Sequence, residues 1–454
     1  MMEAFFDVLS KVLVGVLFGG IVLGVAKVSR ALIGIWYSPL TLFVLRWLLV
    51  IFLYLLNFAG YDAIRPLTWI VLVWSMGAFA IGSLIPMLSA SRRAVPLEIP
   101  DVAAALREVI DKRNFTKAIN LLFFLGVLVL LLYLYSIEGS YGISVLVFTP
   151  YIVRANIAIG RVPLGFQYFY LMETVTALIF LYIYLYRRKT PRLLILLGGF
   201  AAASLVLTTG KVNLVKLVGW CIFLLLYLNL NRLTAARASA LAVVTLLLGF
   251  GLFVVLSTWG GEEFENTLWY QYVPVSGHVG NLLYAYIYNT GQIPTLDNLL
   301  HDSGVEFQWG KLTFLPIAKL IGIVIPEFTV PSHIGTFYPI PFPFNVATYL
   351  DVMYKDFGLF GTLLLPFVLG WLTSAMFVRF LRTPCSFWLF YLNTILALWV
   401  NASVSAAGYL KPVYWFQIGV GYILARYITR TTPQRATIAK MRHQRLSVAS
   451  HNRQ

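Results

Sequence analysis

The sequence predicts an all-α polytopic membrane protein with about 11 transmembrane helices and one large loop outside the membrane that carries short or re-entrant helices. The 454 residues are 60% hydrophobic and only 11% charged, a composition that does not suit a soluble globular protein. Apolar runs of about 20 residues, the length that crosses the hydrocarbon core as a helix, recur along the chain. One long polar interval interrupts them. We therefore expect a single integral membrane domain over residues 1–454.

Eleven apolar stretches are candidates for these spans, and we expect helices because an open strand would leave its backbone groups unpaired in lipid. The stretches lie near residues 7–26, 38–59, 67–89, 118–137, 166–186, 192–209, 212–230, 236–257, 357–380, 386–404 and 412–429. Glu3 and Asp7 precede the first stretch, and no basic segment with a small-residue cleavage site does. This pattern predicts a first span rather than a removed signal peptide.

Basic residues concentrate in alternate loops. With the tail 430–454 in the cytoplasm, about two thirds of the 34 Lys and Arg residues fall on the cytoplasmic side, and every short loop agrees. Such an asymmetry predicts an outside N-terminus and a cytoplasmic C-terminus. The net charge of +16 then orients the chain against anionic lipid, and we expect no nucleic-acid partner. Residues 90–117 form a cytoplasmic loop, in which 101–113 read as an amphipathic surface helix.

The long polar interval, residues 258–356, falls on the outer side and is rich in Trp, Tyr, Phe and Pro. It holds half of the 18 acidic residues and three of the five histidines. Connections of this length are usually functional or disordered, and the aromatic content favours a folded cap. Aromatic rings stack on sugar faces while carboxylates accept hydroxyl hydrogen bonds. The alternative for many of these rings is an aromatic belt at the membrane interface.

Four of the basic residues on the outer side, where they run against the orientation bias, are of special interest. Arg154 and Arg161 fall in the 138–165 loop, and Lys211 and Lys216 flank a tight connection between two spans. A fixed cationic cluster at the membrane surface suits a diphosphate, which Arg binds bidentately and Lys as a point charge. The alternative is that these side chains extend to lipid headgroups.

Two further charges lie inside predicted spans, Arg46 in the second and Glu173 in the fifth. Charges within the membrane usually mark function. A buried ion pair that joins the two helices is an equal alternative, because a long Arg side chain covers the difference in depth.

The residues that close the outer interval form its most distinctive stretch. Prolines and aromatics alternate from Pro339 to Phe344, which favours extended polyproline-like backbone. We expect a helix to begin near Asn345, a good N-cap residue, with Asp351 and Lys355 as an i,i+4 pair. The one-turn spacing of Gly358 and Gly361 predicts close approach of a neighbouring helix.

Part of this stretch fits the pattern N-x-x-T-x(5)-Y-x-D-F-G-x-x-G. The matching residues are Asn345, Thr348, Tyr354, Asp356, Phe357, Gly358 and Gly361. It resembles the signature of bacterial oligosaccharide repeat-unit polymerases, the O-antigen polymerase (Wzy) type. The preceding loop also matches, at residues 288–294 (YNTGQIP) and 310–314 (GKLTF). In quotable motifs the resemblance covers about residues 284–361.

The resemblance implies a metal-independent glycosyltransferase of the bacterial inner membrane, with the helical fold shared with O-antigen ligases (glycosyltransferase C-like) and no cofactor. It transfers a growing glycan from undecaprenyl diphosphate to the next lipid-linked repeat unit at the periplasmic face. Donor and acceptor are both undecaprenyl-diphosphate-linked oligosaccharides. A chain-length-determinant protein and a flippase are the partners that the family implies. Gly210-Lys211 resembles a basic turn of the family, with Lys where Arg is usual.

The chemistry needs cations for the leaving diphosphate and a positioned hydroxyl, with a base where its proton must be removed. We assign the diphosphate to Arg154, Arg161, Lys211 and Lys216, and the glycan or acceptor to Asn345, Thr348, Tyr354 and Lys311. The candidates for the base or for acceptor positioning are Asp356 and His333, then Glu327 and Asp351. Two alternatives stay open. Asp356 would support the Asp-Phe-Gly turn, and His333 would simply line the loop.

Two other functions stay open. An O-antigen ligase uses similar chemistry but transfers the glycan to lipid A, and a flippase or transporter of lipid-linked oligosaccharide would use Arg46 and Glu173 as pathway charges. Polar residues that concentrate on one face favour an enzyme over a transporter. The sequence contains no P-loop, His-Glu-x-x-His or Gly-x-Ser-x-Gly motif, and neither the histidines nor the two cysteines are spaced for a metal site.

Overall fold

The computed structural model describes residues 2–92, 99, 101–145, 165–187, 190–208, 211–232, 234, 251–252, 254–255, 268–325, 338–340, 342–344, 348–403 and 412–429. These residues are mostly helical. The α-helices are α1 (Met2–Ile33), α2 (Pro39–Leu56), α3 (Pro66–Ser91), α4 (Val102–Val109), α5 (Lys112–Tyr141), α8 (Gly165–Tyr186), α9 (Arg192–Ser204), α10 (Lys211–Leu228), α12 (Gly277–Thr290), α13 (Gln292–Leu300), α14 (Leu315–Val324), α15 (Tyr349–Arg382), α16 (Phe387–Ala402) and α17 (Pro412–Ile428). Two 3-10 turns, η2 (Leu205–Thr208) and η4 (Leu268–Gln271), and two short strands, β1 (Tyr338–Pro339) and β2 (Pro343–Phe344), complete the elements.

The all-α character predicted from the sequence is confirmed, and the apolar helices are consistent with a multi-pass membrane protein. Within the described ranges, five helices are long and apolar enough to cross a membrane, namely α1, α2, α3, α5 and α15. Shorter apolar helices include α8, α9, α10 and α16. Ten of the eleven predicted stretches coincide with a helix, while most of 236–257 lies outside the described residues. The total of eleven spans stays a prediction.

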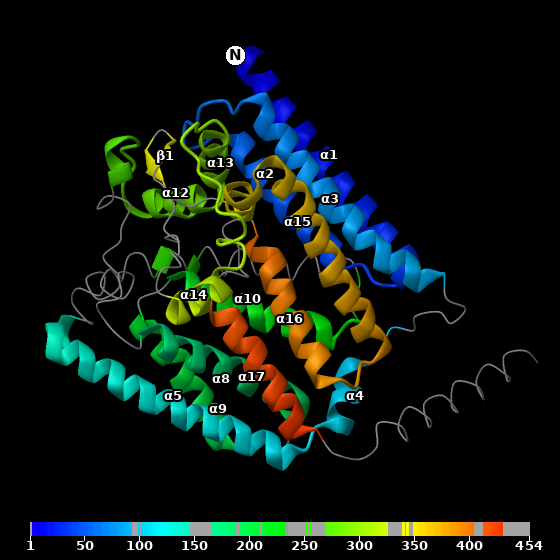
Figure 1. Ribbon diagram of the computed structural model, residues 1–454, viewed down its shortest axis with the longest axis vertical. Coiled ribbons are helices and arrows are strands. Elements are labelled where there is room, and N and C mark those ends of the chain that lie inside the picture. Colours follow the sequence, from blue (N-terminus) through cyan, green and yellow to red (C-terminus); the bar gives the residue numbers. More distant parts are fainter. Residues whose placement is uncertain are drawn as a thin grey trace, which may run out of the picture.

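The long helices α1, α3 and α15 run side by side, and several of the shorter helices cross their direction (Figure 1). Along one edge α3 packs against both α1 and α15, and along the opposite edge α5 packs against α8 and α17. Between them α16 contacts α2, α10, α15 and α17. The short helices α12 and α13 and the β1–β2 hairpin gather at one end of the long helices, and α4 lies at the other (Figure 1).

Reciprocal glycines allow the closest of these helix contacts, between α3 and α15. A methyl group added at Gly82 would overlap with the carbonyl oxygen of Phe367, and one added at Gly370 would overlap with that of Phe79. The hydroxyl of Ser83 donates to the carbonyl of Gly370 at 3.2 Å. Small residues that bring two backbones together are a typical membrane-helix interface, so this crossing fixes α15 and the segment that precedes it.

The segment 101–113 differs from the single surface helix that we expected. Asp101 and Asp111 each cap a separate helix, α4 and α5, through hydrogen bonds of 3.0 Å to backbone N–H groups. Leu106 is buried, and the N–H of Asp111 donates to the carbonyl of Ile428 at 2.7 Å. The apolar face of α4 therefore packs on the protein, beside the ends of α10 and α17, instead of on a lipid surface.

The loops predicted for one side of the membrane do meet in space. An ion pair of 3.6 Å joins Arg232 to Asp101, and Ile110 bridges to Thr429, all from segments expected in the cytoplasm. Which face is cytoplasmic stays a prediction, and the basic tail 430–454 lies outside the described residues.

The entry into α15 corrects three expectations. Tyr338 pairs with Phe344 in an antiparallel hairpin, so the proline-rich stretch folds back instead of continuing as an extended run. The N-cap is Thr348, whose hydroxyl accepts from the N–H of Leu350 at 3.1 Å; Asn345 is outside the described residues. Gly358 has φ 61° and kinks α15, and Gly361 packs on the carbonyl of Met353 across that kink. These two glycines therefore serve a bend within α15 and not a contact with another helix.

Candidate functional site

The carboxylate of Asp356 holds together the two segments that carry the family resemblance. Asp356 is fully buried. One of its oxygens accepts from the N–H of Leu312 at 3.1 Å, and the other accepts from the N–H of Thr313. The backbone adds two bonds, from Gln308 to the carbonyl of Lys355 at 2.9 Å and from Trp309 to that of Asp356 at 3.2 Å. A carboxylate that accepts two backbone N–H groups is a strong local anchor.

The loop that Asp356 anchors, residues 305–314, is called the aromatic loop below. Trp309 and Gly310 both have positive φ, 51° and 89°, so the chain turns sharply in a conformation that a non-glycine residue rarely adopts. As a result the rings of Phe307, Trp309 and Phe314 are 47%, 79% and 53% exposed. Exposed rings held on a rigid loop offer stacking surfaces for sugar faces or for the membrane interface.

Glycines fit the aromatic loop closely against the start of α15. A side chain at Gly358 would press on the ring of Phe307, and one at Gly310 would press on the ring of Phe357. Tyr354 packs edge-on against Phe307 with ring centroids 6.4 Å apart. This packing explains why the segments 310–314 (GKLTF) and 354–358 (YKDFG) lie in contact.

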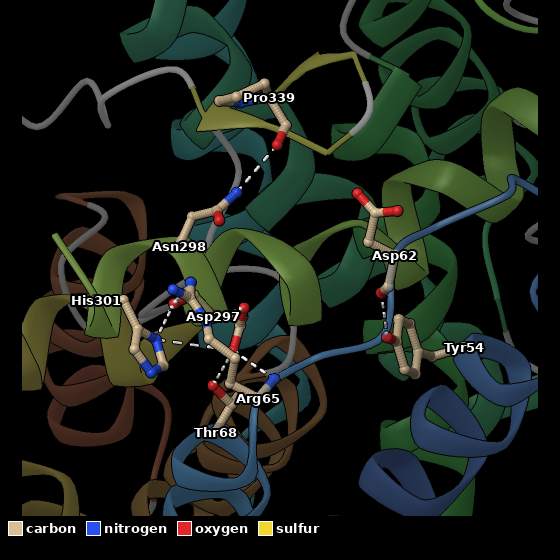
Figure 2. A network of polar contacts seen from close by, with 8 residues as sticks. All are labelled: Tyr54, Asp62, Arg65, Thr68, Asp297, Asn298, His301 and Pro339. Carbon is tan, nitrogen blue, oxygen red and sulfur yellow. Dashed lines mark hydrogen bonds and ion pairs between the residues drawn. The ribbon is translucent and has the colours of Figure 1, made fainter.

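A second anchor fixes α13 to the start of α3 (Figure 2). The side chain of Asp297 accepts from the backbone N–H and the Nε of Arg65, both at 3.0 Å, and from the hydroxyl of Thr68 at 2.5 Å. The guanidinium of Arg65 also donates to the carbonyl of Asp297 at 3.0 Å. Nδ1 of His301 lies 2.8 Å from that same carbonyl. Asp297 is 7% exposed, and these bonds make it a structural group.

Helix α12 is fixed on α2 and on the loop that follows α2. The hydroxyl of Tyr286 donates to the carbonyl of Leu53 at 2.7 Å and accepts from the N–H of Phe58 at 3.2 Å. The hydroxyls of Tyr61 and Thr290 lie 3.0 Å apart. Burial raises the pKa of Tyr61 and of Tyr286 above the usual tyrosine value, so both hydroxyls stay protonated and able to donate at neutral pH. The described residues of the interval 258–356 are called the outer cap below, after its predicted side. Together with Asp297, these contacts attach the outer cap to α2 and α3.

The two intramembrane charges do not pair with each other. Glu173 is fully buried and forms an ion pair of 3.0 Å with Nζ of Lys216, and it accepts from Nε2 of Gln417 at 3.0 Å. Nη2 of Arg46 instead donates to the amide oxygen of Asn289 at 2.7 Å. The expected pairing is wrong because α8 packs against α10 and α17, which brings Lys216 and Gln417 to Glu173.

Lys216 is therefore a poor candidate for a diphosphate ligand. Its side chain is 11% exposed, its charge is balanced by Glu173, and its ammonium lies 4.4 Å from the ring centre of Tyr414. An ion pair at this depth joins α8, α10 and α17, which is a structural role.

Other predicted residues occupy the first turns of α15 and the aromatic loop. Asp351 and Lys355 form the expected i,i+4 pair, 3.1 Å apart and with side chains 13% and 18% exposed. The hydroxyl of Tyr354 points to the carbonyl of Leu300 at 3.5 Å, and Lys311 is half-buried in the aromatic loop. These residues belong to the same outer cap as Asp356. Thr348 is instead the N-cap residue of α15.

Several predicted residues cannot be placed. Lys211 begins α10, but its side chain is not described. Arg154, Arg161, Glu327, His333 and Asn345 lie outside the described residues.

Sequence reasoning missed Arg65 and Asp297, which fix α13 to α3, and it gave no role to Asn289, although Asn289 lies in the 288–294 motif. Two signals were available. Asp297 lies in a short helical stretch of the outer loop, and Arg65 directly precedes the proline that opens a span. Within the ranges that the structure describes, no three His, Cys, Asp or Glu side chains gather as they would around a metal ion. A small cavity between α2, α3, α15 and α16 has an apolar lining that includes Phe43, Phe79 and Trp399, and it offers no charged group for chemistry.

Comparisons with protein-family models, curated proteins and solved structures find no match to this chain.

Proposed function

We propose that this protein polymerises undecaprenyl-diphosphate-linked oligosaccharide repeat units at the periplasmic face of the bacterial inner membrane. The observation that carries the proposal is the contact between the two segments that resemble the polymerase family. Asp356 of one segment binds the backbone of the other at residues 312 and 313, and the loop so formed exposes three aromatic rings at the outer end of the helices. A rigid aromatic surface beside the membrane suits a glycan that arrives on a lipid.

The geometry changes the role that we give to Asp356. Both of its oxygens already accept backbone N–H groups, and the residue is fully buried. We therefore assign it as a positioning residue that shapes the aromatic loop. The base or acceptor-positioning role then passes to Asp351, His333 or Glu327. We assign the glycan contact to Lys311 of the aromatic loop and to Tyr354, which packs against that loop.

The leaving diphosphate still needs cations, because negative charge develops on it as the glycosidic bond breaks. Arg154, Arg161 and Lys211 keep this assignment, and Lys216 is withdrawn from it because Glu173 balances its charge. A transporter would need charges along a pathway between the two faces. The described intramembrane charges, Arg46 and Glu173, are instead each fixed by a separate partner on another helix, which favours the enzyme.

A gene deletion followed by gel electrophoresis of the cell-surface glycan tests this proposal. A polymerase deletion leaves lipid A capped with a single repeat unit, because ligation continues without chain growth. Complete loss of glycan from lipid A would show a ligase instead. Accumulation of repeat units on the cytoplasmic side would show a flippase, and long chains at wild-type abundance would refute all three assignments.

A further inference from the structure

Arg46 carries a charge that no described acidic residue balances. It lies in α2, and Nη2 donates to the amide oxygen of Asn289 at 2.7 Å. Nε is buried and has no hydrogen-bond acceptor among the described residues. The ion pairs among the described residues involve Arg65, Lys216, Arg232, His301 and Lys355, and none involves Arg46.

A guanidinium in this position stays protonated, because arginine side chains are not deprotonated in proteins. An unpaired buried charge is strongly unfavourable, by several kcal/mol, and a neutral amide balances none of it. Arg46 lies about 15 Å along the axis from the end of α2 at Leu56, at about 1.5 Å per residue. Such a charge within a membrane is typically retained for a ligand or a partner, and an anion is the ligand that this group lacks.

The surroundings of Arg46 hold it in a defined orientation. Nδ2 of Asn289 donates to the carbonyl of Ala285 at 2.8 Å, which directs the amide oxygen toward Arg46. Helix α12 is in turn fixed to α2 by the bond between Tyr286 and Leu53 at 2.7 Å. Arg46 and Asn289 are both half-buried, so each keeps part of its surface at the edge of the contact between α2 and α12.

We propose that Arg46, oriented by Asn289, binds a phosphate group of the lipid-linked substrate between α2 and α12. This inference rests on the proposed function for the identity of the lipid. The free Nε and a neighbouring N–H of the guanidinium present the fork that binds two phosphate oxygens at once. A phosphate attached to a lipid enters from the bilayer, whereas a soluble phosphate would have to leave water to reach this depth. An ordinary phospholipid headgroup also carries a phosphate. The test must therefore distinguish a phospholipid from the lipid-linked substrate.

The test measures lipid binding to the purified full-length protein in a zwitterionic detergent. The probes are undecaprenyl diphosphate, undecaprenol and phosphatidylglycerol, and native mass spectrometry or a fluorescence titration gives the affinities. We expect undecaprenyl diphosphate to bind at least tenfold more tightly than undecaprenol. Arg46→Gln should lower the affinity for undecaprenyl diphosphate about tenfold to a hundredfold, the range of one charge-assisted phosphate contact, and should leave undecaprenol unchanged.

Two further variants separate charge from folding. Arg30→Gln removes a positive charge at the opposite end of the long helices, where Arg30 lies over the ring of Trp36 at 4.7 Å, and should bind like wild type. Asn289→Asp places a carboxylate beside Arg46, so it should raise the melting temperature and yet weaken binding of undecaprenyl diphosphate at least tenfold. Because this variant is expected to gain stability, its loss of affinity cannot come from unfolding.

Equal affinity of wild type, Arg46→Gln and Asn289→Asp for undecaprenyl diphosphate would overturn the inference. Equally tight, Arg46-dependent binding of phosphatidylglycerol would overturn the assignment to the substrate. The glycan gel distinguishes this failure from that of the proposed function. Arg46-dependent binding together with long chains in the deletion strain would refute the polymerase alone. Loss of chain growth with binding independent of Arg46 would refute only this site.

Discussion

Replacement of Asp356 by Ala should release the aromatic loop. The change removes the acceptor of two backbone N–H groups, those of Leu312 and Thr313, and both residues are less than a tenth exposed. Each buried N–H left without a partner costs about 1–3 kcal/mol, so the loop should lose about 2–6 kcal/mol of local stability. We expect new protease cleavage within residues 305–314, a lower melting temperature in detergent and shorter glycan chains in cells.

The side-chain chemistry at position 356 separates positioning from catalysis. Asp356→Asn keeps one oxygen acceptor, so it should retain more stability and more polymer than Asp356→Ala. A catalytic base would be lost equally in both variants. Glu306→Ala is the matched control, because it removes an exposed carboxylate from the aromatic loop and a surface substitution usually changes stability by no more than about 0.5 kcal/mol. If Asp356→Ala melts like wild type, resists protease and still makes no polymer, Asp356 acts in the chemistry and our reasoning is wrong.

Three more variants test the packing that supports the site. Glu173→Gln should lower the free energy of unfolding by about 3–5 kcal/mol, because it leaves the charge of Lys216 buried without a partner. A second change, Lys216→Met, should restore much of the melting temperature, and additive losses of stability in the double variant would contradict an ion pair. Gly82→Ala should destabilise the α3–α15 crossing, where a methyl group meets a carbonyl oxygen, whereas Gly77→Ala on the same helix has open space around it and should not; equal melting temperatures would argue against this crossing. Asp297→Ala should detach α13 from α3 and expose the outer cap to protease, and an unchanged digestion pattern would refute that anchor.

Features that depend on local sequence were predictable. The length of an apolar run decides whether it crosses a membrane as a helix, so ten predicted stretches appear as helices. The pair Asp351–Lys355 follows from the helical period alone. The start of α15 was misplaced because Asn345 and Thr348 are both good N-cap residues, and the hairpin from Tyr338 to Phe344 determines where the chain can enter the helix.

Partnerships across the fold were not predictable, because they depend on which helices are neighbours. Glu173 and Arg46 have similar depths, and the sequence alone offers no reason to prefer Lys216 or Gln417 as the partner of Glu173. Asp356 binds the backbone of residues more than 40 positions earlier. Its carboxylate and its place in the family-like motif suggested a catalytic group, and only the position of the aromatic loop shows what its oxygens contact.

The central claim, that this protein joins lipid-linked repeat units, is tested most directly by reconstitution. Purified protein in lipid nanodiscs is mixed with undecaprenyl-diphosphate-linked repeat units in the presence of a chelator and without nucleotide. The account predicts products whose lengths increase by whole repeat units, with release of undecaprenyl diphosphate. Recovery of the repeat units unchanged, from a protein that keeps its wild-type melting temperature, would contradict it.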